Sequence, residues 1–365
     1  MVSTEHTFVI AEAGVNHNGS LELALQLVDA AATAGADAVK FQTFVPEALV
    51  SRRAAKAVYQ QQHTAADESQ LDMLRKLALS HADHLHLRAH CRQRGIEFLS
   101  SPFDIDSAHF LVDTLGVSCL KLGSGEITNG PLLLALARSG KPLILSTGMS
   151  TLEDIEQALA LLAFGFVEAT ARPTAATIAA AYAAAAGRQA LRDKVSLLHC
   201  TTEYPCPFED VNLRAMDTLR EAFGLVVGYS DHTPGINVPI AAVARGARII
   251  EKHFTLDRSL PGPDHQASLQ ADELRAMLDG IRQIEHALGH GRKEPAPSEL
   301  KNRPIARKAL VAARPIRAGE IFTVDNLTAK RPAEGLSPMR YWDVLDRPAE
   351  RDYLTDEAIA PWTNR

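Results

Sequence analysis

Short apolar runs alternate with longer amphipathic segments from the N-terminus to about residue 290. In segment 21–34, for example, Leu21, Ala24, Leu25 and Val28 recur at helical spacing, and segments 68–94 and 271–288 show a similar period. Strands that alternate with helices predict a parallel sheet, and eight such units predict an α/β fold, a (β/α)8 TIM barrel over residues 1–288. The expected strands are 8–11, 38–41, 97–100, 118–122, 142–146, 195–200, 225–229 and 248–252.

Two regions depart from this alternation. Residues 165–193 are rich in alanine and predict an extra helical excursion between the fifth and sixth units, more consistent with a solvent-side helix than with a functional lid. From 289 to 304 the chain is rich in Gly, Pro and charged residues, which predicts a linker. Short strand-like runs divided by Gly, Pro and Asn then predict a small β-rich domain over residues 305–365.

Charged or metal-capable side chains follow several of the expected strands. Glu12 follows FVIA, Lys121 and Glu126 follow VSCL, and His232 and His253 follow the seventh and eighth strands. The carboxyl ends of all barrel strands meet at one face, where the active sites of TIM-barrel enzymes lie. The sequence therefore predicts an enzyme.

Two lysines are expected at neighbouring positions of this face. Lys40 and Gln42 occupy alternate positions of VKFQTF and so point the same way, while KLGSGE places Lys121, Ser124 and Glu126 in one loop. Ammonium groups and loop amides suit a phosphate or carboxylate ligand. A buried barrel lysine can instead form a Schiff base, and the residues alone leave both readings open.

His232 and His253 are the candidate metal ligands, because they stand at the ends of consecutive strands. Imidazole pairs suit Mn, Fe, Co, Ni or Zn better than Mg or Ca, which prefer oxygen. Four further histidines lie on the expected helix 68–94, and for these a solvated face is the favoured interpretation. They are His81, His84, His86 and His90.

Composition excludes several other classes. A net charge of −6 without a Lys/Arg cluster argues against nucleic acid, and no apolar run approaches a membrane span. The N-terminus lacks the features of a signal peptide, and the four cysteines have no disulfide-scaffold spacing. Reduced thiols in a cytoplasmic enzyme are therefore expected.

Ten ordered motifs resemble the sialic acid synthase family. They are IAEAGVNHNG, VKFQTF, SPFD, KLGSGE, LSTGMS, HCTTEYPCP, GYSDHT, EKHFTLD and PGPDH, with RKALVA…AGEIF…NLTAKRPAEGLSP in the C-terminal region. The last resembles the family's antifreeze-like (SAF) domain. The resemblance covers nearly the whole chain and implies condensation of phosphoenolpyruvate with an N-acyl hexosamine, which yields a nonulosonic acid and phosphate.

The resemblance also implies residue roles. Glu12, Glu126 and Lys121 become the catalytic candidates, and Tyr204 and Asp264 contact the sugar. A divalent metal, usually Mn, is held by the two strand-end histidines and polarises the open-chain aldehyde. Arg307 of the SAF cap reaches the partner's barrel, which implies a domain-swapped homodimer. The implied phosphoenolpyruvate ligands are Lys40, Gln42, Ser101, Lys121, Ser124, Ser146, Thr202 and Ser230.

The leading expectation is an N-acetylneuraminate synthase that uses N-acetylmannosamine. The alternative is a legionaminic acid synthase using a 2,4-diacetamido-trideoxyhexose, which the TTEYP string and the RPAEGLSPMRY tail resemble at least as much. Thr202 stands where some relatives carry Asn and leaves the sugar open, and a pseudaminic acid synthase is a further alternative. A Schiff-base aldolase using Lys121 is the reading from a different enzyme class. An ice-binding role for the C-terminal domain conflicts with its charged Lys330, Arg331, Arg340 and Asp343.

Overall fold

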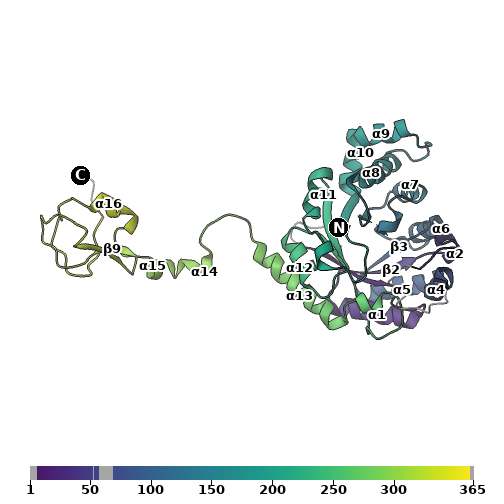
Figure 1. The fold of residues 1–365 in the computed structure, drawn as a ribbon, viewed down its shortest axis with the longest axis horizontal. Helices are drawn as coiled ribbons and strands as arrows, with labels where there is room; N and C mark the ends of the chain where they lie inside the picture. The colour runs from purple at the N-terminus through teal and green to yellow at the C-terminus, as the bar shows by residue number, and fades with distance from the viewer. Residues whose placement is uncertain (1–5, 52, 57–68, 362–365) are drawn as a thin grey trace. The chain divides into compact units, whose positions relative to one another are not determined.

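A computed structural model describes residues 6–51, 53–56 and 69–361. The chain divides into two compact units, Met1–Gly289 and His290–Arg365. In the described part of the first unit, parallel strands form one sheet in the order β3-β2-β1-β8-β7-β6-β5-β4, and β3 and β4 are adjacent at the remaining seam. Figure 1 shows the strands at the centre of this unit with helices around them. The predicted (β/α)8 barrel is thereby confirmed. The strands are β1 Phe8–Gly14, β2 Ala38–Thr43, β3 Glu97–Pro102, β4 Leu120–Leu122, β5 Leu143–Ser146, β6 Val195–Cys200, β7 Val226–Asp231 and β8 Ile249–His253.

Helices surround this barrel, and several of them begin at a residue whose side chain caps the helix. Ser20 caps the first of them by accepting a hydrogen bond from the Leu23 amide, and Gly35 ends it in the left-handed conformation that suits glycine. The helices are α1 Leu21–Ala34, α2 Pro46–Leu49, α4 Gln70–Leu77, α5 His81–Arg94, α6 Ile105–His109, α7 Gly130–Arg138, α8 Leu152–Val167, α9 Ala175–Ala183, α10 Ala185–Lys194, α11 Ala215–Phe223, α12 Asn237–Ala244 and α13 Ala271–Leu288, with η1 Phe110–Thr114, η2 Ser124–Glu126, η3 Phe208–Asp210 and η4 His265–Ala267 as short turns.

The single helix expected over 68–94 is wrong. Its first residue lies outside the described residues, and the rest forms α4 and α5, separated at residues 78–80. Ser80 explains the break: its hydroxyl accepts from the Asp83 amide (3.1 Å), while the Asp83 carboxylate accepts from the Ser80 amide (2.9 Å). This reciprocal capping box starts a new helix at His81.

The solvated face expected for the four helix histidines is wrong for His84. Its side chain is buried where α5 packs against the barrel, and its two ring nitrogens contact Thr43 Oγ1 (2.9 Å) and the Ser80 carbonyl (2.9 Å). His81 stacks on Phe110, with ring centroids 3.7 Å apart, whereas His86 is exposed as expected. His84 is therefore a buried residue of a largely polar helix, and both of its ring nitrogens have hydrogen-bond partners.

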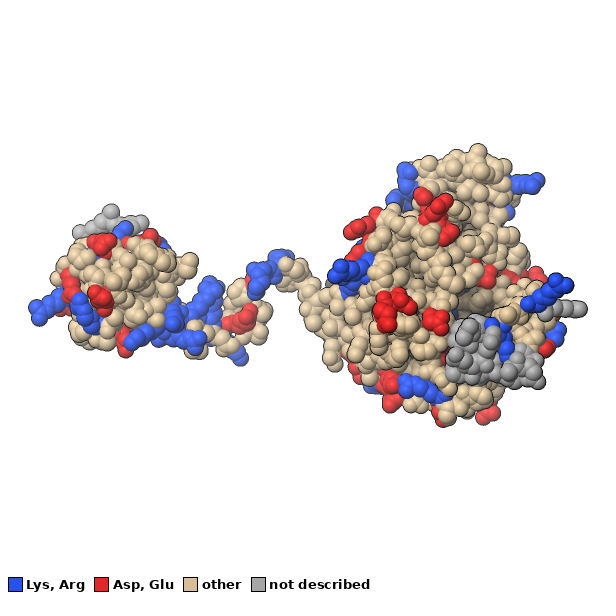
Figure 2. Space-filling model, in the orientation of Figure 1, with Lys and Arg blue, Asp and Glu red and all other residues tan. Residues whose placement is uncertain are grey.

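The alanine-rich segment forms α9 and α10, which pack against α8. A Cβ on Gly187 would lie 2.0 Å from the Ala181 carbonyl oxygen, so the two helices approach too closely there for any side chain. Figure 2 shows few charged side chains on the visible face of this region, at the upper right of the barrel. The excursion is therefore an addition to the helical layer of the barrel.

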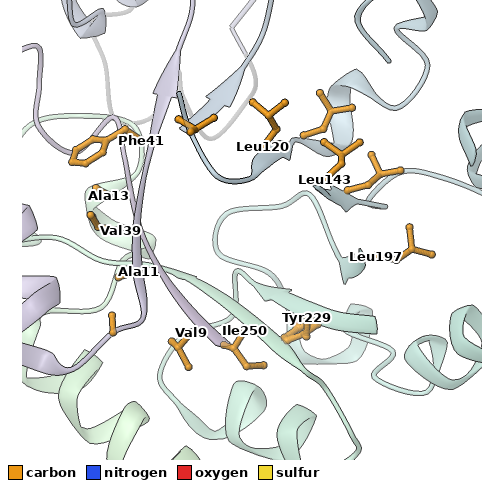
Figure 3. Packing of buried hydrophobic residues seen from close by; sticks show 14 of the residues in the cluster. Val9, Ala11, Ala13, Val39, Phe41, Leu120, Leu143, Leu197, Tyr229 and Ile250 are labelled. Carbon is orange, nitrogen blue, oxygen red and sulfur yellow. The ribbon is translucent and has the colours of Figure 1, made fainter. Parts of the chain in front are cut away.

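Alternation along the strands separates two apolar layers. Val9, Ala11, Val39 and Phe41 point toward the helices, as Figure 3 shows, and belong to the main core. The intervening positions point into the barrel, where they form a second apolar cluster below the carboxyl ends of the strands. Successive side chains of a strand face opposite sides, so each strand contributes to both layers. The interior cluster contains Ile10, Ala38, Leu99, Cys119, Ile144, Leu198 and Ile249.

The second unit has its own small core, which includes Leu310, Phe322 and Tyr353. Two antiparallel strands, β9 Ala309–Ala312 and β10 Leu327–Lys330, pair in it. Its described helical segments are α14 Pro297–Leu300, α15 Arg303–Ala306, η5 Pro338–Arg340 and α16 Tyr341–Val344. The segment 289–304, expected as a linker, thus contains a short helix and the start of another.

Two further expectations can be compared with the structure. All four cysteines are free and buried, as expected for reduced thiols. No helix in the described residues combines the length and apolar character needed to cross a membrane.

Candidate active site

Eight polar or thiol side chains point into the barrel immediately above its apolar interior layer. Each lies two residues beyond an inward-facing position of its strand, so the period of two places all eight at one level. They come from every strand of the barrel and close the bottom of a cavity of about 590 Å³. The eight are Glu12, Lys40, Ser101, Lys121, Ser146, Cys200, Ser230 and Glu251.

Lys40 and Lys121 are the cationic centres of this floor, and both are buried. Lys40 Nζ lies 2.7 Å from Glu12 Oε2, 3.7 Å from Glu251 Oε2 and 3.2 Å from Ser101 Oγ, to which it donates. Lys121 Nζ donates to Ser146 Oγ (2.7 Å) and lies 3.4 Å from Glu251 Oε1. The two ammonium groups therefore flank one carboxylate.

Glu251 is a carboxylate of the floor that the sequence did not single out, whereas Glu12, Glu126 and Asp264 were predicted site residues. Its Oε1 also accepts from Ser230 Oγ (2.9 Å), so it links three predicted site residues. The signal was present in RIIEKH, because Glu251 lies two residues before His253 and must share its face of the strand. The alternation that placed Lys40 with Gln42 applies equally here.

The carboxylates differ in their electrostatic environments. Burial raises the pKa of Glu12 to about 7, although Lys40 opposes the shift. Burial also disfavours the charged form of Glu251, but the ammonium groups of Lys121 and Lys40 outweigh it and lower its pKa to about 2. Burial lowers the pKa of Lys121, whereas Glu12 and Glu251 overcome burial and raise the pKa of Lys40. The floor is consequently suited to an anionic ligand, with one carboxyl group able to exchange a proton near neutrality.

The loops after β4 and β5 and the end of β6 meet at one hydroxyl at the edge of the floor. Ser124 Oγ accepts from the Gly148 amide (2.9 Å) and contacts Cys200 Sγ (3.1 Å). A Cβ on Gly148 would lie 2.4 Å from Thr202 Oγ1, which explains the glycine there. Glu126, in the same loop as Ser124, is half-buried and accepts from Asn129 Nδ2 (2.7 Å).

His232 and His253 lie side by side, with ring centroids 5.6 Å apart. His232 Nδ1 contacts the Thr201 carbonyl oxygen at 2.6 Å, which leaves Nε2 as the acceptor. His253 Nδ1 is buried without a hydrogen-bond partner and lies 3.8 Å from Asp264 Oδ2. Burial lowers the pKa of both imidazoles, so both are neutral at pH 7.

These features fit a divalent transition metal. Neutral imidazoles with free nitrogens are the donors that such ions prefer, and an orphaned buried nitrogen is otherwise costly. Among the described residues, no three His, Cys, Asp or Glu side chains gather as a ligand set.

Tyr204 and Asp264 border the histidine pair. The centroid of the Tyr204 ring lies 4.1 Å from that of the His232 ring. The peptide bond between Tyr204 and Pro205 is cis. Burial raises the pKa of Asp264 to about 6. Both side chains line the same cavity as the floor.

The structure brings together all the predicted site residues of the barrel. The exception is Arg307, an exposed residue of the second unit. The predicted residues that line the cavity are Glu12, Lys40, Gln42, Ser101, Lys121, Ser124, Glu126, Ser146, Thr202, Tyr204, Ser230, His232, His253 and Asp264.

Comparison with known proteins identifies the two parts of the chain. Residues 27–293 match the model of the NeuB family, and residues 307–360 match the SAF domain. The chain is 49% identical to the N,N'-diacetyllegionaminic acid synthase of Campylobacter jejuni over 97% of its length and 98% of the relative. It is 45% identical to the Legionella pneumophila enzyme of the same name, over 93% of this chain and 89% of the relative.

A solved structure with the same architecture is the N-acetylneuraminic acid (sialic acid) synthetase of Leptospira borgpetersenii. It is 33% identical, with a TM-score of 0.65, and the match covers 81% of this chain and 90% of that one. These matches confirm the resemblance inferred from the motifs and the C-terminal SAF domain.

Proposed function

Because the chain belongs to the NeuB family and is similar to legionaminic and sialic acid synthases, we propose that it condenses phosphoenolpyruvate with a 2,4-diacetamido-trideoxyhexose. The products are a legionaminic acid and inorganic phosphate. At the level of class, the chain is an enzyme, a carbon–carbon bond-forming transferase of the nonulosonic acid synthase type. The single observation that carries the proposal is the buried floor of two lysines and several hydroxyls at the ends of the barrel strands.

Phosphoenolpyruvate matches the charge of this floor. Its phosphate and carboxylate are both anionic, and Lys40 and Lys121 supply two buried ammonium groups. Ser101 and Ser146 already accept hydrogen bonds from these lysines, and their hydroxyl protons remain available to an oxyanion. Glu251 holds the lysines in place in the free enzyme, which lowers the cost of two adjacent cations.

C3 of phosphoenolpyruvate attacks the aldehyde carbon of the open-chain sugar, the carbonyl oxygen takes up a proton, and cationic character develops at C2. Water adds to C2 and loses a proton, and the resulting tetrahedral intermediate breaks its C2–O bond to release phosphate. Glu12 is placed to exchange one of these protons, because its pKa lies near 7. Glu126 borders the same cavity and is the second candidate.

The metal that we propose is Mn²⁺, because the resemblance to the family implies it. His232 and His253 would hold it, and a bound ion would polarise the sugar aldehyde as a Lewis acid. Asp264, 3.8 Å from His253 Nδ1, and Tyr204 remain the candidates for contacts with the sugar.

The identity of the sugar is the finer part of the proposal. The relatives at 49% and 45% identity carry the legionaminic name, which favours that alternative over the N-acetylneuraminate expectation. A pseudaminic acid synthase remains an outcome of the substrate test. We also propose a cytoplasmic homodimer in which the SAF unit of one chain brings Arg307 to the barrel of the other.

A Schiff-base aldolase is the second candidate, favoured by one observation. Burial lowers the pKa of Lys121, as a nucleophilic amine requires. Against it, Lys121 donates to Ser146 and faces Glu251, an arrangement suited to a fixed cation.

A phosphate-release assay tests the proposal. Purified protein with Mn²⁺ and phosphoenolpyruvate receives N-acetylmannosamine, its 6-phosphate or a diacetamido-trideoxyhexose in separate reactions. The expected result is phosphate release that requires both substrates and is fastest with the diacetamido sugar. Product formation from pyruvate in place of phosphoenolpyruvate, with a pyruvate imine on Lys121 trapped by borohydride, would support the aldolase instead.

A further inference from the structure

One side of the active-site cavity is lined by apolar side chains. We call this surface the apolar wall, and it comes from three segments: the end of α2, the helix α4 and the loop after β3. Its polar exception is Gln70, at the start of α4. The members of the wall are Leu49, Val50, Met73, Leu74, Leu77 and Phe103.

The wall is anchored by a small hydrophobic cluster that is separate from the main core. Met73 and Leu77 are buried against Val15 and Phe44, and the Phe44 ring meets that of Phe103 edge-on at 6.2 Å. These contacts fix α4 above the strand ends.

Other members of the wall remain available to a ligand. Leu49, Val50 and Leu74 are only partly buried, although they line the cavity. Outside the cavity, an ion pair between Arg75 and Glu47 (2.8 Å) ties α4 to α2. The wall is thus a supported surface that retains exposed apolar area.

The wall and the floor make opposite demands on a single ligand. The floor offers ammonium, hydroxyl and carboxylate groups, whereas the wall offers aliphatic and aromatic side chains and one amide. A hydroxyl group pressed against the wall would lose its water without gaining a partner. A ligand that fills the cavity is therefore polar at the reacting end and carries methyl groups at the other.

From this we infer that the apolar wall binds the non-reacting end of the sugar, namely its C6 methyl group and the methyl of its C4 acetamido group. Gln70 is placed to bond the amide of that acetamido group. N-acetylmannosamine carries a hydroxymethyl and a hydroxyl at these positions, so the wall selects against it. The inference rests on the proposed function and names the part of the cavity that sets the choice of sugar.

Three substitutions test the inference. Leu74→Asn places an amide of similar size on the wall, and Val50→Thr adds a hydroxyl without changing shape. Leu71→Asn is the matched control, because Leu71 lies on the same helix, is also half-buried, and is not among the residues that line the cavity. Steady-state kinetics with the diacetamido-trideoxyhexose are measured for each variant, with circular dichroism to verify folding.

Leu74→Asn is expected to raise the KM for the diacetamido sugar about tenfold, with the KM for phosphoenolpyruvate unchanged, since one misplaced apolar contact changes discrimination by about 10- to 200-fold. Val50→Thr should move the sugar KM in the same direction, and Leu71→Asn should not move it. An unchanged sugar KM in both wall variants, or an equal rise in the control, overturns the inference. So does a changed oligomeric state with an unchanged sugar KM, which would assign the wall to a protein contact. Absence of phosphate release by the wild type with every sugar would instead reject the proposed function.

Discussion

Lys252 Nζ lies 2.5 Å from Asp231 Oδ2, and neither side chain has solvent-accessible surface. The two residues pair across β7 and β8, and each precedes a histidine of the candidate metal pair. Asp231 Oδ1 also accepts from Tyr229 Oη (3.0 Å). The ion pair lies on the helix side of the sheet, whereas the histidines face the cavity. It therefore links the ends of β7 and β8 on the side opposite to the histidines.

Loss of one partner of this pair should destabilise the barrel. Lys252→Met leaves the Asp231 carboxylate buried without its cation, and the free energy of unfolding should fall by about 3–5 kcal/mol in urea titration. Tyr229→Phe removes only one hydrogen bond and should cost about 1 kcal/mol. Mn²⁺ affinity, measured by electron paramagnetic resonance, should weaken in Lys252→Met as the histidines lose their fixed spacing. An unchanged free energy of unfolding and an unchanged Mn²⁺ affinity would show that the ion pair neither stabilises the barrel nor holds the two histidines in place.

Metal removal should abolish turnover, and Mn²⁺ or Co²⁺ should restore it. His232→Ala and His253→Ala should each remove most activity while leaving the fold intact, because the side chains lie at strand ends above the core. The loss should be on the order of several kcal/mol of transition-state stabilisation. His86→Ala, at an exposed position of α5, is the control. Full activity in a metal-free preparation would contradict the assignment.

The position of bond cleavage should be visible in isotope labelling. If water attacks C2 of phosphoenolpyruvate, reaction in 18O-water should label the sugar acid and leave the released phosphate unlabelled. Mass spectrometry of both products makes the comparison. Label in the phosphate would mean P–O cleavage, and the proton-transfer roles proposed for Glu12 and Glu126 would have to be abandoned.

Mixed dimers should reveal whether active sites are shared between chains. Glu126→Ala impairs the barrel and Arg307→Ala impairs the cap, so an exchanged cap gives a mixed dimer one sound site. Random mixing makes half of the dimers mixed, and roughly a quarter of wild-type activity should return on co-refolding. If dimers form and activity does not exceed that of the separate variants, each cap serves its own barrel.

Acid should destabilise the barrel through His17. Burial lowers the pKa of this imidazole to about 4, and its Nδ1 accepts from the Gly19 amide (3.0 Å) in the neutral form. The unfolded chain takes up this proton below pH 6.5, while the folded chain does so only near pH 4. The contribution of His17 to the free energy of unfolding is therefore fully present above pH 6.5. It is lost as the pH drops, and the loss reaches about 3 kcal/mol at pH 4.

Denaturant titration at several pH values measures this effect. His17→Gln should reduce the slope of unfolding free energy against pH between 6.5 and 4, and the same substitution at the exposed His286 controls for loss of an imidazole. An identical slope in wild type and His17→Gln would exclude His17 as the source.

The amino-acid sequence by itself determined the strands, their order of appearance and most of the site. A strand's side chains alternate between its two faces, so Lys40 and Gln42 had to share a side, and strand ends had to carry the chemistry. Helix boundaries were weaker, because the break before His81 depends on a local capping box that periodicity does not reveal. The same alternation predicts that Glu251 faces into the barrel. That it pairs with two lysines from other strands is seen only in the folded barrel.

Tertiary structure alone decided which of these groups touch. Lys40, Lys121 and Glu251 are far apart in the chain, and only closure of the barrel places both ammonium groups within 4 Å of one carboxylate. Burial in that enclosed floor then moves the pKa of Glu12 and of Glu251 in opposite directions, because each carboxyl meets a different balance of desolvation and positive charge. A sequence specifies which side chains face inward, but their distances and shared electric field arise only once distant strands have packed together.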